Sequence, residues 1–325
     1  MTRSCAAAQG RRGRLVQWIC AGAVLASVAA AQSLPPSEAP QVSVVAEQEP
    51  ITPVPQPPAA DPLRLALGER LFGDVRLSAT GNLACASCHD IRSNGAGGNK
   101  TRAGGAKPSL DTLTVFNAAL SFRLGWEGKF RSLAVQAEAS LQNPANMNTN
   151  AEAVVRRLNK DPEMTRQFRA AYGRDPERAD FLDALVTFER SLLTPGGRFD
   201  RWLGGDASAL SPAEREGYRM FKSFGCSSCH QGVNVGGNLF ERQGVFRPLV
   251  PGQPRIVRVP SLRNVAATAP YFHDGSAATL EDAVRRMAAA QLDRTLTDEQ
   301  IASLVLFLKT LTGNYRGSLV TGAAP

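Results

Sequence analysis

Residues 82–90, NLACASCHD, and residues 224–232, FGCSSCHQG, share one pattern: two cysteines three positions apart, followed at once by a histidine. C-x-x-C-H is typical of covalent haem attachment, in which two thioethers anchor the porphyrin and the histidine ligates the iron. One four-cysteine zinc site and two local disulfides are the alternatives, but neither needs a histidine at the same place twice. The repeated motif therefore predicts two haem c groups, held by Cys85, Cys88 and His89 and by Cys226, Cys229 and His230.

The N-terminal segment, residues 1–31, predicts export. Four arginines between residues 3 and 14 precede the apolar run WICAGAVLASVAAA (18–31), which is followed by Gln32 and Ser33. This is the pattern of a signal peptide (1–31), too short in its apolar part to span a bilayer, cut after Ala31. A single membrane anchor is the alternative. Removal of the leader discards Cys5 and Cys20, so every remaining cysteine belongs to a haem motif. We expect a periplasmic protein without a membrane anchor, in a compartment where unused thiols are a liability.

The charge of the expected mature chain argues against a nucleic-acid partner. The whole sequence has 37 Lys and Arg against 29 Asp and Glu, a net charge of +8. Four of these arginines and no acidic residue lie in the leader, so +4 remains. Haem propionates would neutralise most of that excess. No basic cluster interleaved with aromatic residues is present.

The remaining sequence predicts an all-α chain of two tandem cytochrome-c-like domains with long loops. Residues 32–60 are rich in proline and predict an extended linker outside the core. Asp61 and Pro62 form a helix start, and helical periodicity recurs up to residue 311. Ser211 with Glu214, and Thr297 with Gln300, have capping-box spacing. Glycines near Gly204 place the boundary between an N-terminal haem domain (61–204) and a C-terminal haem domain (205–325).

Beyond the haem motifs, the most informative stretch is residues 261–292, SLRNVAATAPYFHDGSAATLEDAVRRMAAAQL, which resembles a known family. Together with TVFNAALSF (114–122) and GWEGKFRSLAVQA (125–137), they resemble the bacterial dihaem cytochrome c peroxidases. The wider group includes the dihaem enzymes that mature methylamine dehydrogenase. The resemblance covers roughly residues 61–313. It implies that the N-terminal haem is the low-potential peroxidatic centre and that the C-terminal haem is a high-potential centre where electrons enter.

The resemblance also assigns ligands. It implies that His89 is the proximal ligand of the peroxidatic haem and that His230 is that of the electron-entry haem. Met287, on the C-terminal side of His273, falls where the family has its axial methionine. A thioether favours reduced iron, which suits a haem that receives electrons. An ordinary core methionine is the alternative, and His273 is interpreted as structural.

Three further assignments come from the resemblance. Trp126 matches the tryptophan between the haems, although a simple packing role is the alternative. Asp111, with the carbonyls of Thr268 and Pro270, matches a calcium site, and hard oxygen ligands suit Ca²⁺. Gln136 matches the distal glutamine.

Two positions depart from the family pattern. Many members close the peroxidatic haem with a second histidine on a loop, but residues 90–129 contain none. We therefore expect an open or water-ligated iron in the fully ferric protein. Asn146 stands where members have the glutamate that moves a proton during O–O cleavage. An amide cannot take up and return a proton, so we expect weakened turnover unless Glu138, Glu127 or water substitutes. Glu138 is two positions from Gln136 and therefore lies on a different face of the helix.

The leading hypothesis is a periplasmic peroxidase of the cytochrome c type that reduces hydrogen peroxide to water. Its electrons would come from a small cytochrome c or a cupredoxin. A dihaem oxidase acting on a partner protein is the second hypothesis, weakened because Met287 replaces the axial tyrosine of the methylamine enzymes. A non-enzymatic electron carrier is the third. Relatives often dimerise, so a homodimer stays open.

Overall fold

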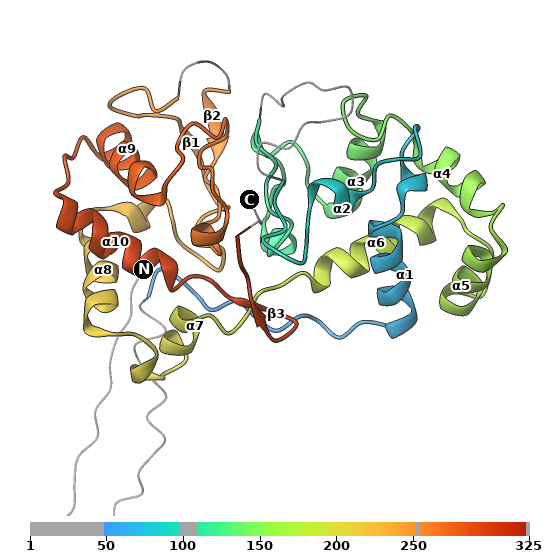
Figure 1. Ribbon diagram of the computed structural model, residues 1–325, viewed down its shortest axis with the longest axis horizontal. Helices are drawn as coiled ribbons and strands as arrows, with labels where there is room; N and C mark the ends of the chain where they lie inside the picture. The colour runs from blue at the N-terminus through green and yellow to red at the C-terminus, as the bar shows by residue number, and fades with distance from the viewer. Residues whose placement is uncertain (1–48, 98–109, 251, 253, 323–325) are drawn as a thin grey trace, which may run out of the picture. The chain divides into compact units, whose positions relative to one another are not determined.

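The computed structural model describes residues 49–97, 110–250, 252 and 254–322 (Figure 1). The expected leader, most of the proline-rich segment and part of the glycine-rich loop after the first haem motif lie outside these ranges. The α-helices are α1 (Pro62–Phe72), α2 (Cys85–Cys88), α3 (Leu133–Gln142), α4 (Ala151–Leu158), α5 (Pro162–Tyr172), α6 (Arg178–Ser191), α7 (Arg198–Leu203), α8 (Pro212–Ser223), α9 (Leu280–Leu292) and α10 (Asp298–Lys309). Within these ranges, no helix is both long and apolar enough to cross a membrane.

The secondary structure is helical, as the periodicity predicts, but it is not purely α. Two small antiparallel sheets are present: β1 (Phe240–Arg242) pairs with β2 (Ile256–Arg258), and β3 (Asn314–Tyr315) pairs with β4 (Ser318–Leu319). The all-α expectation is therefore only partly right. Both capping boxes are confirmed, at the starts of α8 and α10.

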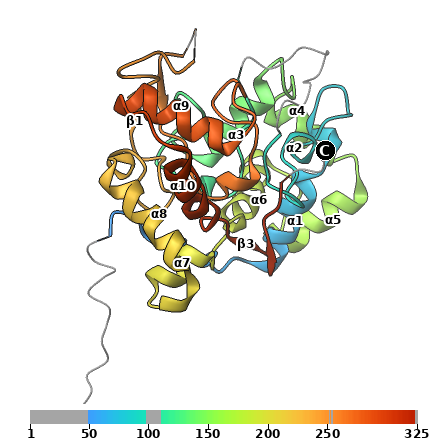
Figure 2. The same ribbon diagram turned by 60° about the vertical axis from the view of Figure 1, so that its left-hand side comes forward.

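One helix crossing occurs twice and builds each half of the chain around its haem motif. In the N-terminal half (residues 62–192), α1 crosses α6 so closely that a Cβ on Gly68 would lie 2.0 Å from the carbonyl oxygen of Ala184. In the C-terminal half (residues 198–313), α8 crosses α10, and a Cβ on Gly217 would lie 2.0 Å from that of Ser303. Figure 2 shows α8 beside α10. Only glycine allows this approach.

The four phenylalanines one helical turn beyond these contacts also match. Phe72 meets Phe188 with ring centroids 5.3 Å apart, and Phe221 meets Phe307 at 5.1 Å. Phe72 and Phe221 each also approach the motif histidine of their own half. The two halves are therefore structural repeats, with an aromatic pair packed between the helix crossing and the haem motif.

A second repeated unit follows each haem motif. Asn117 and Asn264 both adopt the left-handed conformation with φ of 60°. Their backbone N–H groups donate to the carbonyls of Leu192 and Leu311, which end the last helical segment of each half. The N-caps of α3 and α9, Ser132 and Thr279, are separated in the sequence by the same interval as the two asparagines. Positions in residues 111–142 can therefore be matched one by one, at this constant offset, to positions in residues 258–289.

Two large hydrophobic cores and one small cluster (Leu249, Val250 and Ala290) are found among the described residues. The change from the first to the second falls between Leu192 and Phe199, a few residues before the boundary expected near Gly204. The first and last described segments each join the core of the other half: Ile51 lies in the C-terminal core, whereas Val320, just after β4, lies in the N-terminal core. The interpretation of residues 32–60 as lying outside the core is wrong for Ile51 and Val54, which are buried.

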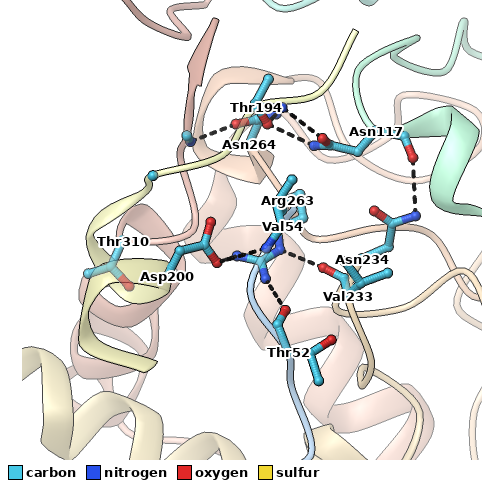
Figure 3. Close-up of polar contacts among 12 residues, drawn as sticks. Thr52, Val54, Asn117, Thr194, Asp200, Val233, Asn234, Arg263, Asn264 and Thr310 are labelled. Carbon is cyan, nitrogen blue, oxygen red and sulfur yellow. Dashed lines mark hydrogen bonds and ion pairs between the residues drawn. The ribbon is translucent and has the colours of Figure 1, made fainter. Parts of the chain in front are cut away.

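Buried polar side chains connect the first described segment and the two halves of the chain (Figure 3). Arg263 pairs with Asp200 at 2.7 Å and donates to the carbonyl of Thr52 at 2.8 Å. Thr194, in the connection between the halves, accepts hydrogen bonds from the side-chain amides of Asn117 (2.8 Å) and Asn264 (3.0 Å). The N-terminal segment and the two halves are thus held by the same network.

Candidate haem sites

The first motif histidine is held by one backbone carbonyl. Cys85 and Cys88 begin and end α2, and His89 follows as its C-cap residue. The Nδ1 atom of His89 lies 3.1 Å from the carbonyl oxygen of Gly95, which also accepts from the backbone N–H of Val115. Burial lowers the pKa of His89, which favours the neutral ring. A neutral imidazole whose Nδ1–H is bound to a carbonyl presents Nε2 to a metal.

The second motif histidine has the same surroundings. Nδ1 of His230 lies 3.2 Å from the carbonyl oxygen of Val235, which also accepts from the N–H of Leu262. Burial lowers the pKa of His230 to about 4. Both rings are therefore oriented and kept neutral in the way that an iron ligand requires.

The four motif thiols form no disulfide bonds with one another. All four are free cysteines, and burial raises the pKa of Cys85 to about 12 and that of Cys226 to about 11. Across the part of the chain that the structure describes, no three His, Cys, Asp or Glu side chains are grouped as a metal site. The geometry therefore does not support the zinc or disulfide alternatives for these residues.

A cavity of about 670 Å³ adjoins both motifs and is lined by Cys85, His89, Cys226, His230 and Met287. The residues that line this cavity show whether the chain suits a haem group. Arg258 lines this cavity and is only 6% exposed, and its Nη1 has no hydrogen-bond partner among the described residues. A buried guanidinium needs an anion. A haem propionate would satisfy it, so the residues present fit the cofactor. Arg258 was missed by the sequence reasoning, because nothing in its neighbourhood in the sequence marks it.

The two halves differ at one matching position of α3 and α9, where the side chain lines the cavity. Met287 lies on α9, eight residues after the N-cap Thr279. The matching residue on α3, eight after the N-cap Ser132, is Ser140. Both line the cavity. The thioether of a methionine can ligate iron. The side chain of Ser140 is shorter than that of Met287, and its hydroxyl accepts a hydrogen bond from the Asn146 amide at 3.4 Å.

The distal candidates of the N-terminal half lie together. Gln136 and Asn146 are both half-buried and both line the cavity. Glu138 does not line it but forms an ion pair with Arg178, as expected from its different helix face. Glu127 lines the cavity, but its carboxylate is partly exposed and lies 2.8 Å from Lys129.

A buried carboxyl at the cavity was also missed by the sequence reasoning. Glu189, on α6 directly after Phe188, lines the cavity, and its Oε2 is buried without a hydrogen-bond partner among the described residues. Burial raises the pKa of Glu189 to about 8. The residue at the matching place in α10 is Leu308, directly after Phe307, so the N-terminal half has a titratable group where the C-terminal half is apolar. Nothing in the neighbouring sequence marks Glu189, which becomes notable when folding buries it at the cavity.

Trp126 lies at the contact between the halves. It and His273 are matching positions, because the interval between them is the one that separates Asn117 from Asn264, and their rings meet edge-on at 6.2 Å. Two reciprocal backbone bonds flank them: Asp111 N–H donates to the carbonyl of His273 (2.6 Å), and Arg258 N–H donates to that of Trp126 (2.7 Å). The indole N–H of Trp126 donates to the Asp111 carbonyl at 2.8 Å. The indole is therefore fixed between the two motifs at a local pseudo-two-fold axis.

The three expected calcium ligands, Asp111, Thr268 and Pro270, belong to the lining of the same cavity. Burial, and the nearby Asp274, raise the pKa of Asp111. Among the described residues, no lysine or arginine forms an ion pair with it. A partly buried carboxylate is the kind of oxygen ligand that Ca²⁺ prefers, and the calcium site stays a prediction.

Two attachment motifs, each with its histidine in the same carbonyl cradle beside one cavity, define a c-type dihaem cytochrome. Residues 62–208 match the family described as di-haem cytochrome c peroxidase, and residues 214–312 match cytochrome c. The chain belongs to the dihaem cytochrome c peroxidase family and is an oxidoreductase of that type. The family implies two haem c groups.

Several known proteins are similar to this chain over most of its length. Cytochrome c551 peroxidase of Nitrosomonas europaea is 36% identical over 288 residues, which are 83% of this chain and 86% of that protein. Methylamine utilization protein MauG of Methylorubrum extorquens is 34% identical over 245 residues, 69% of each chain. A crystal structure of a MauG-like protein associated with microbial copper homeostasis superposes with a TM-score of 0.68 at 27% identity, covering 80% of this chain and 93% of that one.

Proposed function

We propose that this protein reduces hydrogen peroxide to water at the N-terminal haem, with electrons that enter at the C-terminal haem. The observation that carries this proposal is the difference between Ser140 and Met287 at matching positions. His89 and His230 would each hold one haem, Met287 would supply a thioether to the second, and Ser140 would offer the first no comparable ligand. When bound, the haem groups supply the redox chemistry, and the polypeptide arranges access, protons and electron transfer around them.

The distal side chains can bind the substrate but cannot carry its protons. Gln136, Ser140 and Asn146 offer hydrogen-bonding groups at the cavity, so they can hold peroxide beside the free face of the iron. None of them is a proton carrier at neutral pH. Proton transfer must therefore use water or a carboxyl at the cavity, and Glu189 is the buried candidate.

Trp126 would connect the two centres. Its indole is bound at the carbonyl of Asp111, its ring lies against His273, and its own carbonyl accepts from Arg258. The indole is held by two of these contacts and the Trp126 backbone by the third, which favours one orientation and a constant electron-transfer geometry. Trp126→Phe keeps an aromatic ring but removes the N–H donor, and we expect slower electron transfer between the haems with unchanged binding of both.

The deciding experiment mixes the fully ferric protein with peroxide and a ferrous small cytochrome or reduced cupredoxin in a stopped-flow instrument. We expect oxidation of the donor at once, without prior reduction of the enzyme, because no histidine in residues 90–129 is available to close the iron. A lag that disappears only after half-reduction would contradict an open N-terminal site. Absence of any peroxide loss would favour a pure electron carrier.

Asn146 favours a second candidate function. A site that handles protons poorly would reduce peroxide slowly and retain oxidising equivalents, as expected of an oxidase that acts on a partner protein. That function predicts a long-lived oxidised state after peroxide and slow reaction with small cytochromes. The same stopped-flow traces separate the two functions by the lifetime of the oxidised state.

The calcium proposal concerns Asp111, Thr268 and Pro270. A bound Ca²⁺ would neutralise the carboxylate and stabilise the segment whose carbonyl holds the Trp126 indole. We expect chelation to slow electron transfer between the haems and Asp111→Ala to reproduce that effect. Chelation without effect on wild-type protein would contradict the site.

We place the protein in the periplasm. The four cysteines outside the expected leader are all used by haem motifs, and residues 1–31 have the pattern of a cleaved signal. Cell fractionation, with N-terminal sequencing of the recovered protein, tests cleavage after Ala31. Recovery in the membrane fraction with an intact leader would contradict this placement.

A further inference from the structure

An aromatic cluster lies in the C-terminal half, away from the cavity lining. Trp202 stacks on Phe199 with ring centroids 5.6 Å apart, and Tyr218 meets Trp202 edge-on at 5.7 Å. None of these three residues lines the haem cavity. Tyrosine and tryptophan are the side chains of this cluster that lose an electron most readily, so its position relative to the haem sites matters.

Ring contacts continue from this cluster to the second motif. Tyr218 lies 4.9 Å from Phe307, Phe307 lies 5.1 Å from Phe221, and Phe221 lies 6.4 Å from the ring of His230. All distances are between ring centroids. Packed atoms therefore connect the phenol of Tyr218 with the proximal ligand of the C-terminal haem, and electron transfer is faster through packed atoms than across a gap.

The hydroxyl group of Tyr218 has a proton acceptor. Tyr218 is 3% exposed and donates a hydrogen bond to the carboxylate of Glu49. The ammonium of Lys222 lies 3.0 Å from the same carboxylate and 4.4 Å from the centre of the Tyr218 ring. Burial, together with Glu49, raises the pKa of Tyr218, so the phenol is protonated at neutral pH. Loss of an electron must then be accompanied by loss of this proton.

We propose that Tyr218 is a redox-active tyrosine that holds one oxidising equivalent when peroxide has reacted and no electron donor is bound. This inference rests on the proposed function, because hydrogen peroxide is the oxidant. Peroxide takes two electrons, and two protons from solvent, as it becomes two water molecules. Tyr218 would supply one of these electrons through Phe307, Phe221 and His230, and the bound haem groups would supply the other.

The proton of the phenol moves along its hydrogen bond to Glu49. The products are a neutral tyrosyl radical and a neutral carboxylic acid, so the proton stays within the buried pair. An electron that later arrives from a donor, together with return of the proton, restores both residues. Lys222 holds the Glu49 carboxylate beside the phenol before the proton moves.

Tyr172 provides a matched control. Its hydroxyl donates to Asp183 at 2.9 Å, and the guanidinium of Arg64 lies 4.6 Å from its ring centre. It therefore has the same combination of phenol, carboxylate and cation. Its described ring contacts end at Phe168, 6.1 Å away, and do not continue to a haem ligand.

The test freezes the haem-loaded protein after one equivalent of peroxide without donor and records its EPR spectrum. We expect a tyrosyl radical, narrowed by ring-deuterated tyrosine, in wild type and in Tyr172→Phe, and its loss in Tyr218→Phe. Tyr218→Phe keeps the ring and all of its packing. A radical that survives in Tyr218→Phe, or that responds to deuterated tryptophan instead, overturns the proposal.

Glu49→Gln tests the proton acceptor. The amide still accepts the hydrogen bond but cannot take the proton, so we expect radical formation to slow by about 100-fold, the typical size of a lost proton acceptor. An unchanged rate overturns the role of Glu49. Peroxide is assayed in the same samples. Consumption without a Tyr218 radical overturns this inference alone, and no consumption by wild type overturns the proposed function as well.

Discussion

Ser140 and Met287 occupy the same position in the two halves of the chain, eight residues after the N-caps Ser132 and Thr279. Each faces the cavity that also receives the motif histidine of its half. The histidine cradles are nearly identical, with Nδ1 distances of 3.1 and 3.2 Å to a carbonyl. The two cradles are therefore alike, and Ser140 and Met287 are a matched pair of side chains by which the two haem sites differ.

Replacement of Ser140 by methionine should block the free face of the N-terminal iron. Ser140→Met supplies a thioether at the position that Met287 has in the other half, and we expect the N-terminal iron to become six-coordinate and low-spin. Peroxide consumption should fall with it. Optical and EPR spectra of the ferric protein measure the change. Ser140→Ala, which is equally short, should leave the high-spin signal in place, and a Ser140→Met protein that keeps that signal would refute the matched-position argument.

Addition of a carboxyl beside Gln136 should speed turnover. Asn146→Glu provides a group that can take up and return a proton at the cavity, and general acid–base catalysis typically contributes about 10² to 10⁴ in rate. Steady-state peroxidase assays measure this. Asn146→Gln is the control, because it lengthens the side chain without adding a titratable group. Equal rates for Asn146→Glu and wild type would mean that the proton already has another carrier.

Glu189 should make the stability of the chain depend on pH. Its pKa in the folded protein is raised to about 8 from an ordinary value of 4.5. Between these values the folded chain holds a proton that the unfolded chain has released. The free energy of unfolding should therefore fall as the pH rises through this window, by roughly 1.4 kcal/mol for each pH unit at most.

Glu189→Gln should remove that slope while it preserves the shape of the side chain. Guanidinium unfolding of the haem-loaded protein at pH 5 and pH 8 gives the comparison. The difference in stability between wild type and variant should be more favourable to wild type at the lower pH. A difference that is the same at both pH values would show that Glu189 does not titrate in this window.

The ion pair of Arg263 and Asp200 should be needed for folding stability. Both side chains are almost fully buried, and Arg263 also donates to Thr52 and Val233. Arg263→Met leaves an unpaired buried carboxylate, so we expect a loss of about 3–5 kcal/mol in the free energy of unfolding. The double variant Arg263→Met with Asp200→Leu should recover part of it. A single variant that loses less than about 1 kcal/mol would contradict this role.

The sequence predicts the features that are local in the chain. The haem motifs, the cap of α1 at Asp61 and the capping boxes at Ser211 and Thr297 each need only a few neighbouring residues. The family resemblance added Met287, Gln136 and Trp126, which the structure places at the cavity without testing their roles.

Features that depend on contacts between distant segments could not be predicted in this way. Arg258 and Glu189 are notable only because folding buries them at the cavity. The burial of Ile51 depends on the folded C-terminal core, whereas a proline-rich stretch on its own indicates an exposed linker. The match of Ser140 to Met287 becomes visible only when hydrogen bonds and helix caps define the repeat that relates the two halves.

The central claim is that the two covalently held irons are unequal, one with a free face and one capped by sulfur. An EPR spectrum of the fully ferric, haem-loaded protein at low temperature tests it most directly. We predict one high-spin and one low-spin signal in equal amounts, with the high-spin signal abolished by His89→Ala and not by His230→Ala. Two equivalent low-spin signals, or a denatured polypeptide that retains no haem, would contradict the account.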